Sequence, residues 1–171
     1  MNPMQSINRL AIAFAAALAV FTLAAAPATA QMAKNGQPRG MGSWHSAGTV
    51  KDLGEGQGSF FGEYWGVSFG QNGSGFLHEM SWYCTGEATW SGGQIKGGGG
   101  LCTMTDPAGD KVYVRWQPDK PTPAGQFLNR GTYLHGTGKY TGISGYYLLE
   151  GRAAADSNFV GNFIAGEYKL P

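Results

Sequence analysis

Residues 111–117 read KVYVRWQ, and this stretch decides the fold class. Val112, Val114 and Trp116 alternate there with residues that carry charged or polar groups. Successive side chains of a β-strand point to opposite faces, so an alternation with a period of two predicts a strand with one buried face. We therefore expect these three side chains to point into the interior of a β-sheet protein.

Strand-like segments recur on both sides of this stretch, separated by turns rich in Gly, Asp and Pro. Glycine is frequent among aromatic and β-branched residues, and a helix would lose about 1 kcal/mol at each such glycine. Many short strands favour a barrel or a sandwich, and closure removes the open edges at which sheets aggregate. We therefore predict an all-β fold, a single antiparallel closed barrel of about eight strands. The predicted strands cover residues 46–53, 58–69, 75–84, 86–91, 94–105, 111–117, 131–140, 144–151 and 159–168.

The N-terminus is predicted to be an export signal over residues 1–30. Arg9 is its only charged side chain, an apolar run follows over residues 10–26, and Ala28 and Ala30 form a small-x-small cleavage site. A membrane anchor is the alternative, but the run is rich in Ala, as in bacterial signals, and no second run long enough to span a membrane follows. We expect cleavage after Ala30 and delivery to the periplasm or the medium.

The remaining chain has the length of one domain, about 140 residues. Residues 31–43 contain few apolar side chains and are predicted to be a flexible arm, so the barrel domain is expected over residues 44–171. Without the signal, basic and acidic residues balance and the basic ones are scattered. This balance argues against nucleic acid as a partner.

Cys84 and Cys102 are the two cysteines of the chain. An even pair in an exported protein predicts a disulfide. A redox-active pair is the alternative, but such pairs favour C-x-x-C spacing at a helix start. No cofactor and no metal site are predicted, because the three histidines lie far apart in sequence and no phosphate-binding or nucleophile motif is present.

Two more segments carry candidate site residues on their predicted inner faces. Alternation over residues 75–84 places Phe76, His78, Met80, Trp82 and Cys84 together. Alternation over residues 60–69 groups the side chains of Phe61, Glu63, Trp65, Val67 and Phe69.

Glu63 and His78 are the candidate catalytic residues, because a carboxylate and an imidazole in an aromatic interior suit proton transfer. The alternative interpretation places Glu63 in solvent at the barrel mouth and His78 in the core. The candidate ligand-binding residues are Trp65, Phe76, Trp82 and Trp116, whose rings either grip a small apolar molecule or simply fill the barrel.

Residues 136–145 read GTGKYTGISG. This segment resembles the Gly-Thr-Gly-Lys-aromatic-x-Gly hairpin of the allene oxide cyclase and dirigent β-barrel superfamily. The resemblance implies an eight-stranded barrel whose pocket holds an apolar substrate and steers cyclisation or coupling by shape. No acidic residue of that family is carried over to a position of this chain. Residues 42–44, Gly-Ser-Trp, are also similar to the start of lipocalins.

Three functions agree with these observations. The first is binding of a small apolar or aromatic molecule without reaction, since no catalytic motif is present. The second is a cyclase or isomerase that acts on an apolar substrate inside the barrel through Glu63 and His78. The third is an envelope interaction protein or an inhibitor that uses outward tyrosines such as Tyr83 and Tyr113. The sequence predicts no oligomeric state.

Overall fold

The computed structural model describes residues 32–154 and 156–171. The predicted export signal over residues 1–30 lies outside the described residues. Within the described part of the chain, no helix is long and apolar enough to cross a membrane.

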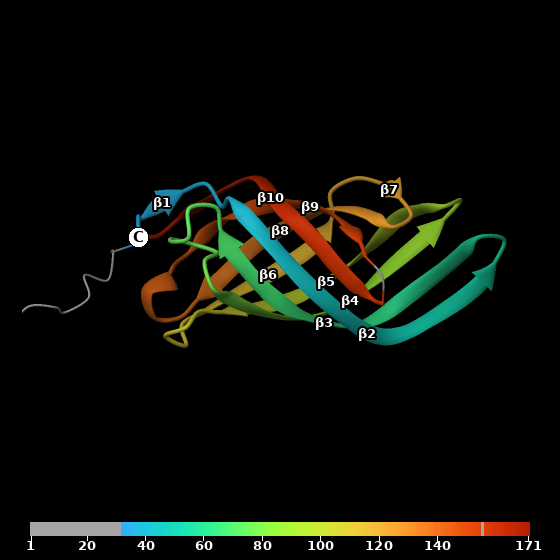
Figure 1. Cartoon of the computed structure of the whole chain (residues 1–171), viewed down its shortest axis with the longest axis horizontal. Coiled ribbons are helices and arrows are strands. Elements are labelled where there is room, and N and C mark those ends of the chain that lie inside the picture. The colour runs from blue at the N-terminus through green and yellow to red at the C-terminus, as the bar shows by residue number, and fades with distance from the viewer. Residues whose placement is uncertain (1–31, 155) are drawn as a thin grey trace, which may run out of the picture. The chain divides into compact units, whose positions relative to one another are not determined.

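The described residues form a closed antiparallel β-barrel, which confirms the predicted fold class (Figure 1). Strands that are consecutive along the barrel wall pair with each other, and β10 closes the wall by pairing with both β9 and β2. Two short strands, β1 (Asn35–Gly36) and β7 (Thr122–Pro123), and the 3-10 helix η1 (Gly138–Tyr140) complete the fold. The eight wall strands are β2 (Gly40–Gly54), β3 (Gln57–Gly70), β4 (Met80–Ser91), β5 (Gln94–Thr105), β6 (Lys111–Pro118), β8 (Gln126–Gly136), β9 (Ser144–Ala153) and β10 (Asn158–Lys169).

Several predicted segments differ in the structure. The strands predicted over residues 75–84 and 86–91 form one strand, β4, and the strand predicted over residues 131–140 ends at Gly136, before η1. The predicted flexible arm over residues 31–43 is corrected, because β1 pairs with β10 and β2 already begins at Gly40. Backbone pairing orders this part of the chain, and two of its few apolar side chains add to it, since Pro38 is fully buried and Met32 packs against the core. The strand predicted over residues 75–84 begins only at Met80, because positive φ angles at Gly73, Gly75 and Leu77 turn the chain before it.

The inner faces of β4 and β6 are as predicted. Met80, Trp82 and Cys84 on β4 are buried, as are Val112 and Val114 on β6. Their outward neighbours are exposed or half-buried. Alternation therefore identified the inner face correctly wherever one face carries polar side chains.

The predicted inner face of β3 is wrong. Phe61 and Trp65 are exposed on the outside, while Phe60, Tyr64 and Ser68 face inward. Both faces of β3 carry aromatic rings, so apolar content did not distinguish them. The inner face instead combines rings with small residues, a pattern that suits the limited interior of a small barrel.

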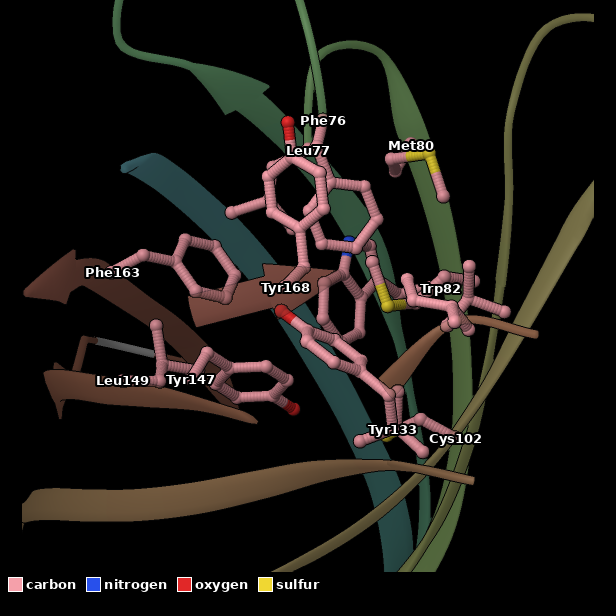
Figure 2. Packing of buried hydrophobic residues seen from close by; sticks show 14 of the residues in the cluster. Phe76, Leu77, Met80, Trp82, Cys102, Tyr133, Tyr147, Leu149, Phe163 and Tyr168 are labelled. Atoms are coloured by element: carbon pink, nitrogen blue, oxygen red, sulfur yellow. The ribbon is translucent and has the colours of Figure 1, made fainter. Parts of the chain in front are cut away.

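One end of the barrel is closed by residues 71–79, the segment between β3 and β4. Leu77 and Phe76 enter the interior and are buried. The Phe76 ring centroid lies 4.7 Å from that of Tyr168 and 5.4 Å from that of Tyr133 (Figure 2). Ser68 Oγ donates a hydrogen bond of 2.9 Å to the Leu77 carbonyl. The closed end is therefore packed by rings and tied by hydrogen bonds.

A buried carboxylate anchors the segment GTGK to this closed end. Asp106 accepts hydrogen bonds from the backbone N–H groups of Ala108 and Asp110 and from the Tyr140 hydroxyl, and it forms an ion pair with Lys139. Burial by itself raises the pKa of Asp106, but the bonds from Lys139, Asp110 and Tyr140 outweigh it and lower the pKa below the ordinary value of 3.8. The charged form of Asp106 therefore stabilises the fold.

Large rings on the inner wall lie over glycine residues. A Cβ added to Gly131 would lie 2.0 Å from Tyr147 Cζ, and one added to Gly58 would lie 2.3 Å from Trp90 Cζ2. These separations are far below van der Waals contact, so only glycine leaves room for the ring at these positions. The same relation holds for Gly42 and Trp44, Gly62 and Phe60, Gly86 and Trp116, and Gly151 and Phe127. The glycines let the rings lie close to the wall.

Candidate functional site

The end of the barrel opposite residues 71–79 contains a cavity of about 230 Å³. It lies where β4 turns into β5 and where β6 leads through β7 into β8. Rings and aliphatic side chains provide nearly all of its surface. The lining residues are Trp44, Phe60, Tyr64, Trp82, Cys84, Ala88, Trp90, Ile95, Cys102, Trp116, Pro118, Thr122, Phe127, Leu128, Asn129, Tyr147, Leu149 and Phe159.

The floor of the cavity is the middle layer of the barrel core. Trp82 packs edge-on against Trp44 and Tyr147, with ring centroids 5.7 and 5.9 Å away. Trp82 Nε1 donates a hydrogen bond of 2.8 Å to Ser68 Oγ, so the polar atom of this ring is satisfied away from the cavity. The floor is thereby fixed in position by the packed end beneath it.

The walls near the opening are half-buried rings set on the glycines described above. Trp116 lies over Gly86 and Gly100, and the Tyr64 ring packs edge-on against it at 5.7 Å. Because a ring over glycine lies close to the backbone, it covers the wall without crossing the barrel centre. The cavity is the space that remains between these rings.

The disulfide predicted between Cys84 and Cys102 is confirmed. The two residues are directly opposite each other on β4 and β5, with Cα atoms 3.9 Å apart, and both line the cavity. The bond fixes the two strands at the level of the cavity floor. No free cysteine is found among the described residues.

Polar groups in the cavity are few. Tyr64 and Tyr147 contribute phenolic hydroxyls, and neither donates a hydrogen bond to any residue of the described ranges. Thr122 Oγ1 is already bonded to the Gln126 carbonyl at 2.8 Å. Burial raises the pKa of Tyr64 to about 12 and raises that of Tyr147 further, so both phenols are neutral donors at neutral pH.

The structure separates the four residues predicted to bind a ligand. Trp82 and Trp116 line the cavity. Phe76 is buried in the packed end instead. Trp65, which is 41% exposed, lies on the outer face beside His45. The prediction for Trp65 is wrong because it rested on the inverted face of β3.

The predicted catalytic pair is not formed inside the barrel. Glu63 lies on the outer face of β3, where its carboxylate accepts a hydrogen bond of 2.5 Å from the Tyr83 hydroxyl. His78 lies beyond β3 in residues 71–79, with Nε2 at 3.9 Å from Glu79 and its ring beside Phe69. The alternative interpretation placed Glu63 in solvent at the barrel mouth. The Glu63 side chain is exposed to solvent, but it lies on the outer face of the barrel wall.

Several lining residues were missing from the sequence-based candidates, including Trp44 and Phe60. The sequence did indicate that Phe60 faces inward. Gly58, Phe60 and Gly62 lie on one face of the strand, and this alternation of small and large residues is typical of the inside of a small barrel. The glycine beneath the Tyr147 ring is Gly131, which lies on another strand. This contact can be predicted only when the register between β8 and β9 is known.

A second hollow of about 240 Å³ lies over β4, β5, β6 and β8. The outward tyrosines Tyr83 and Tyr113 line it together with His135. The Tyr113 and His135 rings stack with centroids 4.3 Å apart. Within the described residues no group of three His, Cys, Asp or Glu side chains is placed to hold a metal ion.

Comparison of the chain with protein-family models, with curated proteins and with solved structures finds no match. The resemblance of residues 136–145 to the allene oxide cyclase and dirigent superfamily therefore stays a prediction. The functional argument depends on the geometry of the barrel and its cavity.

Proposed function

We propose that this protein is an exported β-barrel that binds one small apolar or aromatic molecule in the cavity at the open end. The observation that carries the proposal is an apolar cavity of about 230 Å³ in a barrel whose other end is packed solid. An apolar cavity of about 150 Å³ is enough to bind benzene. The site therefore has room for a somewhat larger ring compound.

The aromatic lining supports binding without reaction. Ring faces and edges supply dispersion contacts to an apolar molecule, and burying that molecule removes its surface from water. A cyclase or isomerase mechanism through Glu63 and His78 would require both groups in the interior, and Glu63 is outside it. The proposed function is therefore carriage or capture of the ligand, and the predicted export signal would place this function in the periplasm or the medium.

The test is ligand binding by the purified mature protein. Four tryptophans line the cavity, so a bound aromatic compound will change the intrinsic fluorescence. Native mass spectrometry of protein from its own host, combined with thermal-shift screening of lipids and phenols, will identify ligand classes. A ligand at 100 times its Kd is expected to stabilise the folded state by about 2.7 kcal/mol.

Two variants on the same strand provide a matched control. Ala88→Phe adds a ring inside the cavity, whereas Glu87→Phe adds the same ring on the outer face. We expect Ala88→Phe to weaken binding at least tenfold and Glu87→Phe to leave it unchanged. Recovery of only empty protein from the host, with no thermal shift across the panel, would refute the proposal.

A further inference from the structure

No charged side chain of the described residues lines the cavity. Its lining consists of apolar residues, two tyrosines, one threonine and one asparagine. An ion moved from water into such surroundings loses its hydration, and no side chain of opposite charge lines the cavity to compensate. The lining therefore discriminates against carboxylates and amines, including fatty acids with a buried head group.

The two phenols supply hydrogen-bond donors, which the apolar part of the lining lacks. The Trp116 Nε1–H is also buried without a partner in the described part of the chain, but it lies over Gly100 at the barrel wall. Tyr147 is 2% exposed, yet its hydroxyl has no hydrogen-bond partner among the described residues. Buried polar groups are normally hydrogen-bonded, so an unpartnered hydroxyl at a cavity surface points to a missing partner. Tyr64, which packs against Trp116 and Phe159, also lines the cavity, and its hydroxyl has no hydrogen-bond partner among the described residues. Each phenol can donate one hydrogen bond to an oxygen of the ligand.

From this arrangement we infer that the ligand is an uncharged aromatic molecule carrying an oxygen acceptor, such as a ketone or an ether, which accepts a hydrogen bond from Tyr147 or Tyr64. The inference rests on the proposed function and names the ligand class of the same cavity. The aromatic rings select the body of the ligand. The phenols select its oxygen, and the uncharged lining rejects ions.

Three probes of nearly identical shape separate these contributions. They are 2-isopropenylnaphthalene, which has no acceptor, 2-acetylnaphthalene, which has a neutral carbonyl, and 2-naphthoate, which is an anion at neutral pH. Isothermal titration calorimetry on the mature protein measures their affinities. We expect the acetyl compound to bind roughly three to ten times more tightly than the isopropenyl compound, as one additional hydrogen bond predicts. The naphthoate is expected to bind at least tenfold more weakly than the acetyl compound.

Removal of the phenolic hydroxyls tests the assignment of the donors. In a Tyr64→Phe/Tyr147→Phe variant the affinity for the isopropenyl compound should be unchanged and the preference for the acetyl compound should disappear. Tyr83→Phe, which removes a hydroxyl from the outer face, should keep the preference. If the double variant does not fold, the two single variants are compared, and at least one must reduce the preference.

The outcomes distinguish the inference from the proposed function. Absence of binding by all three probes would count against the proposed function itself. Equal affinities for the acetyl and isopropenyl compounds would leave that function standing and overturn the inferred acceptor. Tightest binding by 2-naphthoate would overturn the inferred neutrality, and a preference that survives removal of both hydroxyls would overturn the role of the tyrosines.

Discussion

The substitution Gly131→Ala tests whether the inner rings depend on the glycines beneath them. The added Cβ would lie 2.0 Å from Cζ, 2.2 Å from Cε1 and 2.4 Å from the hydroxyl oxygen of Tyr147. All three atoms belong to one tyrosine side chain, which must move by about 1.4 Å to restore contact distance. That ring is held by Trp82, Tyr133 and Phe163, so the movement disturbs the cavity floor.

The expected effect is a loss of about 1–3 kcal/mol of unfolding free energy, the usual cost of overpacking a core. The sign of the change in unfolding free energy distinguishes a clash from its absence. Where the backbone permits alanine and no clash occurs, Gly→Ala stabilises a protein by about 0.4–1 kcal/mol, because it restricts the unfolded chain. Urea denaturation followed by circular dichroism measures the difference. Gly97→Ala is the matched control, since the nearest atom to its added Cβ is Thr89 Oγ1 at 3.1 Å and no ring lies over it.

A double-mutant cycle with Tyr147→Leu completes the experiment. Leucine lacks the three atoms that meet the new Cβ, so Gly131→Ala should cost at least 1 kcal/mol less in that background. Stabilisation by Gly131→Ala alone, or strict additivity in the cycle, would refute the reasoning that the ring requires a glycine.

Two further predictions concern stability. Cys84 and Cys102 are 18 residues apart in sequence, so reduction of their disulfide should lower the unfolding free energy by roughly 3 kcal/mol. Equal denaturation midpoints with and without dithiothreitol would contradict this prediction. Asp106→Asn should destabilise the protein at pH 7 by about 1.5–3 kcal/mol, because it removes a buried charged acceptor. Since the folded-state pKa of Asp106 is lowered, its contribution is full above the unfolded value of about 3.9 and is lost as the pH falls through the folded value. Melting temperatures measured from pH 6 down to pH 2 should therefore decline less steeply in Asp106→Asn than in the natural protein, and parallel curves would contradict the assignment.

Much of the fold was predictable because several strands have one polar face. On β6, Lys111 and Arg115 mark the outside, so Val112 and Val114 were assigned correctly to the interior. On β3 both faces carry rings, and the rule that apolar residues face inward selected Phe61 on the wrong side. The alternation of small and large residues was the better signal there.

The candidate site was less accessible from the sequence. The cavity exists because particular rings lie over particular glycines, and pairs such as Gly131 and Tyr147 are joined only by the register of β8 and β9. The prediction that Glu63 and His78 form a catalytic pair was wrong for a local reason. Residues 71–79 turn out of the strand pattern, and the face assigned to Glu63 was inverted. Alternation does not extend through positive φ angles.

The division of the barrel into a filled end and a hollow end has a practical consequence for engineering. Because the ring cluster around Phe76 and the anchor at Asp106 secure the molecule at a distance from Ala88 and Ile95, the hollow can be reshaped while its support is left intact. Libraries confined to those lining positions would change the shape of the hollow and, under the proposed function, the compound that it binds. The fluorescence of the tryptophans in the lining would then show whether the hollow is occupied, without an attached dye.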